Sequence, residues 1–135
     1  MHRPHMAWIN ITERCNNRCT YCYAKNSLHE RRKIIPFDEI KKIIDKLAQI
    51  KMERCILMGG EPTLHPNIID IFKYAWDKNL GINLITNGTR FADEKFCTEF
   101  KKVGFGAGSA IFSMHASSQA DSYVITRNKM YFKLF

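Results

Sequence analysis

The sequence contains no run of about 20 apolar residues, the length that a membrane-spanning helix needs. Its first five residues do not lead into the apolar stretch that is typical of a secretory signal. We therefore expect no signal peptide, no membrane partner and a cytoplasmic location. Internal repeats, low-complexity segments and a convincing linker are also missing. We expect residues 1–135 to form a single domain.

Acidic residues are fewer than basic ones. The sequence has 13 Asp and Glu and 21 Lys and Arg, which gives a net charge of +8. Such an excess can attract nucleic-acid phosphates. Most of the lysines, however, fall on the polar faces of expected helices, and the aromatic pattern of RNA-reading modules does not accompany them. We do not expect a nucleic-acid partner.

The sequence has five cysteines, an odd number that argues against a disulfide framework and favours a reducing compartment. Three of them, Cys15, Cys19 and Cys22, fall within eight residues. A 4Fe–4S cluster normally takes four cysteine ligands. Three ligands would leave one iron open, and an open position distinguishes catalytic metal sites from structural ones. A zinc site completed by His29 is the alternative.

The remaining pattern alternates between strands and helices. Short apolar runs predict four strands, and apolar residues at helical spacing predict three helices between them. This alternation predicts an α/β fold with a parallel sheet, and the almost continuously apolar strands predict burial of both sheet faces. The expected strands are residues 7–12, 54–58, 82–85 and 110–114, and the expected helices lie within residues 36–50, 68–76 and 93–103.

The chemically unusual residues follow the ends of these strands. The cysteines follow the first strand, Gly59-Gly60-Glu61-Pro62 the second and Thr86-Asn87-Gly88 the third, while Ser113 and His115 close the fourth. In barrels built from alternating parallel strands and helices, the loops that follow the strands form the active site. We therefore expect these four segments to meet in one site.

The spacing CxxxCxxC, with Tyr21 before the last cysteine, resembles the signature of the radical S-adenosylmethionine (radical SAM) family. The resemblance implies that Cys15, Cys19 and Cys22 hold a 4Fe–4S cluster whose open iron chelates SAM. One electron would then cleave SAM and give a 5′-deoxyadenosyl radical, which abstracts hydrogen from a substrate. An electron donor such as flavodoxin or ferredoxin would be the partner.

The same resemblance implies roles for further residues. The GGEP segment, Gly59, Gly60, Glu61 and Pro62, would contact the amino group of SAM, and Glu61 offers a carboxylate to a cation. Tyr21 would sit against the adenine, Thr86 and Asn87 would line the SAM pocket, and Ser113 would reach the ribose or carboxylate. Arg127 is either a further carboxylate contact or a surface residue, and His115 carries no assigned role. Cys55 and Cys97 are interpreted as packing residues.

The resemblance covers residues 7–127 and implies an incomplete barrel, with four of the family's roughly six βα units. We expect residues 1–135 to be a truncated core that lacks most of the substrate-determining half. The substrate would be a peptide, a protein or a cofactor precursor. The apolar edge of the fourth strand is expected to favour self-association. The alternative function is an iron–sulfur or zinc-binding module without catalysis.

Overall fold

The computed structural model describes residues 5–24, 33–104 and 108–129. Its four strands form one parallel sheet in the order β1-β2-β3-β4, so each strand lies beside its predecessor in the sequence. The predicted α/β fold with parallel strands is confirmed. The strands are β1 (Met6–Thr12), β2 (Arg54–Gly59), β3 (Gly81–Thr86) and β4 (Gly108–Phe112). His29, the alternative zinc ligand, lies outside the described residues.

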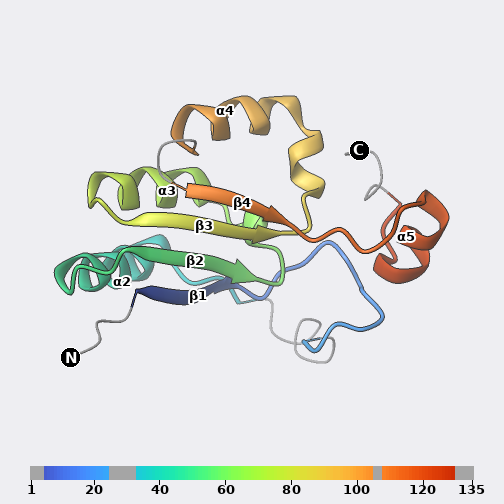
Figure 1. Cartoon of the computed structure of the whole chain (residues 1–135), viewed down its shortest axis with the longest axis horizontal. Helices are drawn as coiled ribbons and strands as arrows, with labels where there is room; N and C mark the ends of the chain where they lie inside the picture. Colours follow the sequence, from blue (N-terminus) through green and yellow to red (C-terminus); the bar gives the residue numbers. More distant parts are fainter. Residues whose placement is uncertain (1–4, 25–32, 105–107, 130–135) are drawn as a thin grey trace.

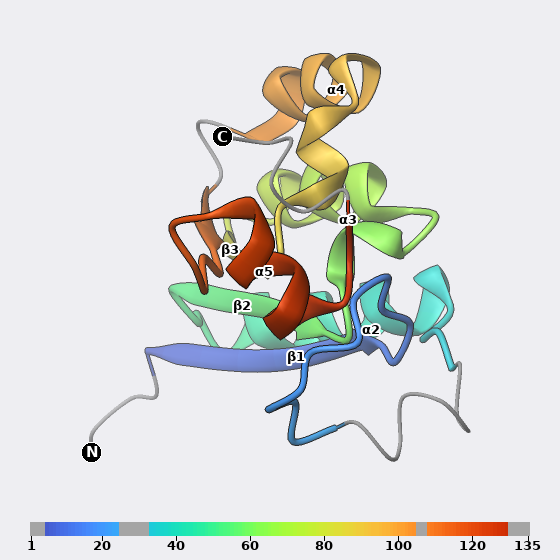
Figure 2. The ribbon, with the colours of Figure 1, turned by 90° about the vertical axis from the view of Figure 1, so that its right-hand side faces the viewer.

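The three predicted helices connect successive strands and lie on one side of the sheet (Figures 1 and 2). They are α2 (Phe37–Gln49), α3 (Ile68–Asp77) and α4 (Glu94–Gly104). A further helix, α5 (Gln119–Thr126), was not predicted and lies beyond the end of the sheet where the strands finish. Across the part of the chain that the structure describes, no helix is long and apolar enough to cross a membrane.

The core lies between the sheet and these three helices. Alternate residues of the strands point into it, and Ile11, Leu57 and Leu84 are completely buried there. Ile40 and Ile44 of α2 and Phe72 of α3 cover them, as the helical spacing of their apolar residues predicts. This packing fixes the strands and, with them, the loops that follow their ends.

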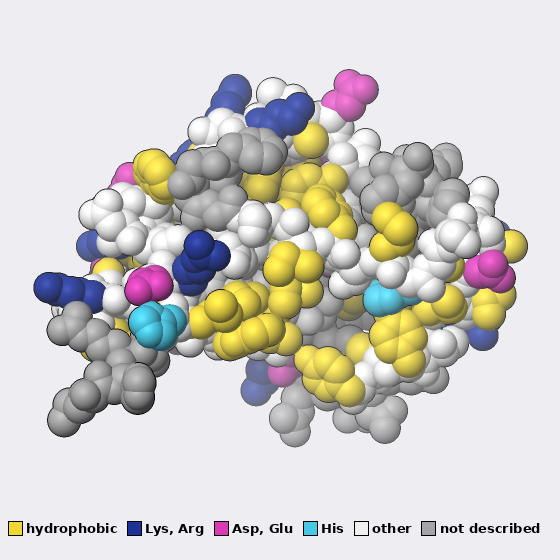
Figure 3. Space-filling model, viewed as in Figure 1, with side chains coloured by type: hydrophobic (Ala, Val, Ile, Leu, Met, Phe, Trp, Pro, Cys, Tyr) yellow, Lys and Arg dark blue, Asp and Glu magenta, His cyan; other side chains and the backbone are white. Residues whose placement is uncertain are grey.

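The opposite face of the sheet is only partly covered, which corrects the expectation that both faces are buried. Ile56 in β2 is 4% exposed, whereas Trp8 in β1 is 58% exposed and Ile111 in β4 is 48% exposed. Figure 3 shows apolar side chains gathered along the middle of the visible face. The apolar run of each strand predicted burial on both faces of the sheet. However, β1 and β4 are the two outer strands of the described sheet.

The fourth strand begins and ends two residues earlier than predicted. The Ser113 amide still donates to the Thr86 carbonyl at 2.9 Å. After Thr86, β3 gives way to a turn in which Gly88 has a φ of 79°, so β4 has no strand to pair with beyond this point. Ser113 and His115 therefore lie in the loop after the strand, not within it.

Candidate functional site

The ends of the four strands surround one cleft. Its volume of about 240 Å³ is several times the ~30 Å³ that one water occupies in the liquid. The cleft can therefore take an organic molecule and not only a single ion. Ten of the predicted site residues line it: Cys15, Cys19, Tyr21, Cys22, Gly59, Gly60, Glu61, Thr86, Asn87 and Ser113. Pro62 does not line the cleft, because it is buried at the start of the short 3-10 helix η1 (Pro62–Leu64).

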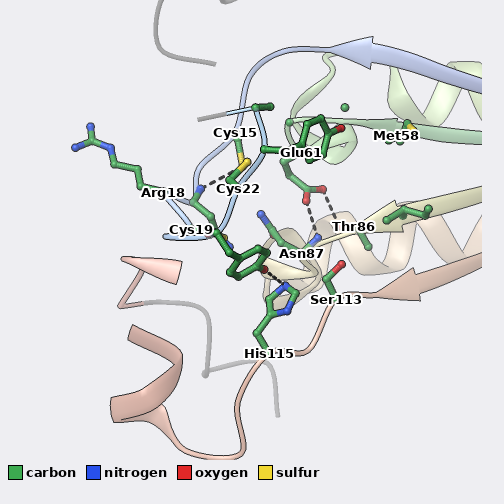
Figure 4. Close-up of a pocket in the computed structure, with 17 residues that line it drawn as sticks. Cys15, Arg18, Cys19, Cys22, Met58, Glu61, Thr86, Asn87, Ser113 and His115 are labelled. Atoms are coloured by element: carbon green, nitrogen blue, oxygen red, sulfur yellow. Dashed lines mark hydrogen bonds between the residues drawn. The ribbon is translucent and has the colours of Figure 1, made fainter. Parts of the chain in front are cut away.

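The cysteine loop, residues 15–22, leaves β1 at the mouth of this cleft (Figure 4). Its three thiols are partly exposed and free of disulfides. The Cys15 sulfur accepts a hydrogen bond from the Asn17 amide at 3.4 Å. Burial raises the pKa of the Cys15 thiol to about 11. The thiol is therefore protonated at neutral pH, and a metal that binds there must displace its proton.

In the described part of the chain, the three thiols do not converge on a point that a single metal ion could occupy. Among the described residues, no three His, Cys, Asp or Glu side chains lie close enough together to share one metal ion. A cubane does not need such convergence, since each of its cysteines ligates a different iron. All three thiols nevertheless face the same cleft. Cys15, Cys19 and Cys22 are therefore the residues that would hold the cluster.

Two glycines bring the end of β2 against the start of the cysteine loop. The Gly60 amide donates to the Thr12 carbonyl at 2.8 Å, and the Glu61 amide donates to the Arg14 carbonyl at 2.7 Å. A Cβ on Gly59 would lie 2.3 Å from the Thr12 oxygen, and a Cβ on Gly60 would lie 2.4 Å from the Arg14 oxygen. Only glycine permits this approach between the two backbones.

We expect Gly60→Ala to displace the cysteine loop, because the obstructing atoms are backbone atoms that cannot rotate away. The cost in folding free energy should be on the order of 1–3 kcal/mol, as for other overpacked positions. Urea unfolding measures this loss, and iron content after anaerobic reconstitution measures the effect on the cysteine loop. Gly81→Ala, at the start of β3, is the comparison variant. Equal stability and iron content in Gly60→Ala and the unmodified chain would contradict the prediction.

Glu61 is buried, with 1% of its surface exposed, and its carboxylate lies between two loops (Figure 4). Its Oε1 accepts from the Thr63 amide at 3.1 Å and from the hydroxyls of Thr63 and Thr86, each at 2.6 Å. Its Oε2 accepts from the Asn87 amide at 2.7 Å. A carboxylate offers about four acceptor positions. Three of these bonds end on Oε1 and one on Oε2, so the carboxylate ties η1 to the end of β3 and keeps one acceptor position at Oε2.

The Thr86-Asn87-Gly88 segment connects β3 with the cysteine loop. The Thr86 hydroxyl accepts from the Gly88 amide at 2.9 Å, and the positive φ of Gly88 is the one expected of such a turn. The Asn87 side chain donates to the Asn16 Oδ1 at 2.8 Å, and the Asn16 side chain donates to the Thr89 hydroxyl at 2.6 Å. The cysteine loop therefore contacts the ends of both β2 and β3.

Tyr21 and His115 meet across the cleft. The Tyr21 hydroxyl and His115 Nε2 are 2.5 Å apart, and the two rings pack edge to face with centroids 5.0 Å apart. Desolvation lowers the pKa of His115 below its usual value, which favours the neutral ring at physiological pH. Sequence reasoning left His115 without a role. No local pattern could have paired two residues that are 94 positions apart.

The other residues considered from the sequence lie away from the cleft. Arg127 is exposed, follows α5 in a left-handed conformation with a φ of 55°, and does not line the cleft. Cys55 is completely buried in β2, and burial raises the pKa of its thiol to about 12. Cys97 lies partly buried on α4 and does not line the cleft. Packing roles for both cysteines fit this environment.

Known proteins share both this sequence pattern and this fold. A PqqA peptide cyclase of Bradyrhizobium diazoefficiens is 34% identical over 92 residues, which are 68% of this chain and 24% of the relative. A GTP 3′,8-cyclase of Desulforamulus reducens is 30% identical over 100 residues, which are 71% of this chain and 30% of the relative. The chain thus spans less than a third of the length of these relatives.

Among solved structures, Streptococcus suis SuiB bound to S-adenosylmethionine superposes with a TM-score of 0.78 at 16% identity, over 94% of this chain and 29% of SuiB. At this identity the likeness concerns the fold alone. The sequence model of the Radical SAM superfamily matches residues 9–127. This match begins within β1 and includes β2, β3, β4 and the whole of α5. The chain therefore belongs to the radical SAM superfamily.

Proposed function

We propose that this chain binds a 4Fe–4S cluster through Cys15, Cys19 and Cys22 and binds S-adenosylmethionine in the adjoining cleft. The observation that carries the proposal is the meeting of the three thiols with the Gly59-Gly60 backbone in one cleft. When bound, the cluster would supply one electron for the cleavage of S-adenosylmethionine, and the 5′-deoxyadenosyl part of that molecule would become the radical that abstracts hydrogen from a substrate. The five free cysteines support a reducing, cytoplasmic setting.

The residues of the chain have separate tasks in this proposal. The three cysteines hold the cluster, and the Gly59-Gly60 backbone allows close approach of the ligand because neither residue carries a side chain. The exposed ring of Tyr21, held by His115, presents an apolar surface on which an adenine can stack. Thr86 and Ser113 line the cleft, and the Thr86 hydroxyl is already bonded to Glu61 and Gly88. Glu61 holds the Thr86-Asn87 segment in place.

We propose a peptide, a protein or a cofactor precursor as the substrate class. One relative is named as a peptide cyclase and another as a GTP cyclase, so the family accommodates both kinds of substrate. The uncovered face of the sheet, with Trp8 and Ile111, is the surface that such a substrate would meet. A one-electron donor of the flavodoxin or ferredoxin kind is the expected partner.

The experiment is an electron paramagnetic resonance spectrum of the reduced, reconstituted chain with and without S-adenosylmethionine. We expect the signal to change on addition, because the ligand coordinates the open iron. Formation of 5′-deoxyadenosine should accompany the change. A cluster signal that does not respond to a large excess of S-adenosylmethionine would indicate an iron–sulfur module without catalysis. Stoichiometric zinc in place of iron would indicate a zinc-binding module.

A further inference from the structure

The middle of the cysteine loop contacts α5, a helix far away in the sequence. The Arg18 amide donates to the Thr126 carbonyl and the Thr20 amide donates to the Ile125 carbonyl, each at 2.9 Å. These two amides lie on either side of Cys19. In Figures 1 and 2, the end of α5 lies beside this loop. The last carbonyls of a helix have no partners within the helix, so they are free to accept such bonds.

A side-chain bond reinforces this contact. The left-handed conformation of Arg127 reverses the chain after α5, and the Asn128 Nδ2 then donates to the Asn17 Oδ1 at 2.6 Å. Asn17 is only 6% exposed, so its amide oxygen needs a partner within the protein. The Asn128 amide in turn donates to the Thr126 hydroxyl at 3.3 Å, which holds the turn in shape.

The beginning and the middle of the cysteine loop are thus held by different parts of the fold. The bonds from Gly60 and Glu61 hold the chain at Thr12 and Arg14, before the first cysteine. Within the loop, the bond from the Cys22 amide to the Cys19 carbonyl is long, at 3.2 Å. Among the described residues, the backbone bonds that tie the stretch around Cys19 to the rest of the fold come from the end of α5.

We infer that the turn at residues 125–128 is a latch that fixes the cysteine loop in the shape that presents its thiols, with Asn128 as the positioning residue. The role of the latch in cluster binding rests on the proposed function, whereas its hold on the loop is a property of the chain without metal. Partners of metal ligands commonly orient the ligands in this way. Asn128 acts through Asn17 and does not line the cleft.

The first test uses the chain without metal and measures amide hydrogen exchange by nuclear magnetic resonance. In Asn128→Ala, the amides of Arg18 and Thr20 should exchange about fivefold faster, the effect of losing one typical hydrogen bond. The Leu57 amide in β2 should not change. Lys129→Ala, which alters the exposed neighbouring residue, is the matched control and should behave like the unmodified chain.

A second variant, Asn128→Asp, keeps the size of the side chain but replaces the donor with an acceptor. It should accelerate exchange at the same two amides. If Asn128→Ala also accelerates exchange at Leu57, then Asn128→Asp is the variant that tests the latch. Exchange at Arg18 and Thr20 that equals that of the unmodified chain in both variants would overturn the latch. Because no metal takes part, this result does not depend on whether the chain binds a cluster.

The second test measures the release of iron to a chelator after reconstitution. The Asn128 variants should lose iron several-fold faster than the unmodified chain and Lys129→Ala. If even the unmodified chain takes up no iron, the proposed function fails and the exchange experiment alone judges the latch. If the cluster forms and all four chains release iron at one rate, the latch has no role in holding the cluster.

Discussion

Replacing any one of Cys15, Cys19 and Cys22 with alanine is expected to abolish the iron and sulfide bound after anaerobic reconstitution. Each thiolate would ligate a different iron. A cluster with three protein ligands, where four are usual, should not stay bound when one of the three is removed. Iron and acid-labile sulfide per chain are the quantities to measure. We expect at least a tenfold loss in each variant, and circular dichroism should show that the fold is retained.

The remaining two cysteines provide the controls. Cys97→Ala removes a partly buried thiol from α4 and should leave the iron content unchanged. Cys55→Ala should also retain iron, because the thiol is completely buried in β2 and does not line the cleft. Some stability should be lost there, since the substitution leaves a small cavity. Full iron binding in two or more of the loop variants would exclude the proposed site.

The second large effect is expected at Glu61. Replacement with alanine leaves the amides of Thr63 and Asn87 without their buried acceptor, and the hydroxyl of Thr86 loses its partner as well. Unsatisfied buried groups of this kind cost about 1–3 kcal/mol each. Because the hydroxyls can rotate to other partners, we expect a total loss of roughly 2–4 kcal/mol in the free energy of unfolding.

Glu61→Gln separates the two halves of this network. It keeps one acceptor oxygen for the two threonines but turns an amide nitrogen toward the Asn87 amide, so the loss should be about half as large. Glu99→Ala, on the exposed face of α4, is the matched control and should change stability by less than about 0.5 kcal/mol.

Urea unfolding of the metal-free chain measures these differences. A direct role of Glu61 in binding S-adenosylmethionine would give the opposite pattern. Ligand affinity would then fall in both Glu61 variants while their stability stayed at the level of the unmodified chain. The structure argues for the first pattern, since the hydrogen bonds of the buried carboxylate tie η1 to the end of β3.

Much of the site followed from local sequence patterns. Alternating apolar runs located the sheet, and the rule that parallel strands end at one edge brought the three loops together. What these features share is that each depends on residues close together in the sequence or on a general rule of topology.

The missed features depend on contacts between distant residues. The segment that forms α5 contains Val124, Ile125 and Thr126, which are β-branched and weakly helical, and exposed Tyr123 and Val124 break the apolar period. The end of β4 was misplaced because it is set by where β3 turns away, not by the apolar residues of β4 itself. Likewise, the hydrogen bonds that hold Glu61 come partly from Thr86 and Asn87, which belong to another strand end.

The distance between Asn17 and Asn128 along the chain has a consequence for biosynthesis. These residues are 111 positions apart, so the ribosome produces the cysteine loop long before the helix that holds it. At about 5–20 residues per second, the interval is roughly 5–20 seconds. During that time the three thiols are exposed and their loop lacks its hold at Cys19. Delivery of iron and sulfide should therefore be productive only after residue 128 has left the ribosome.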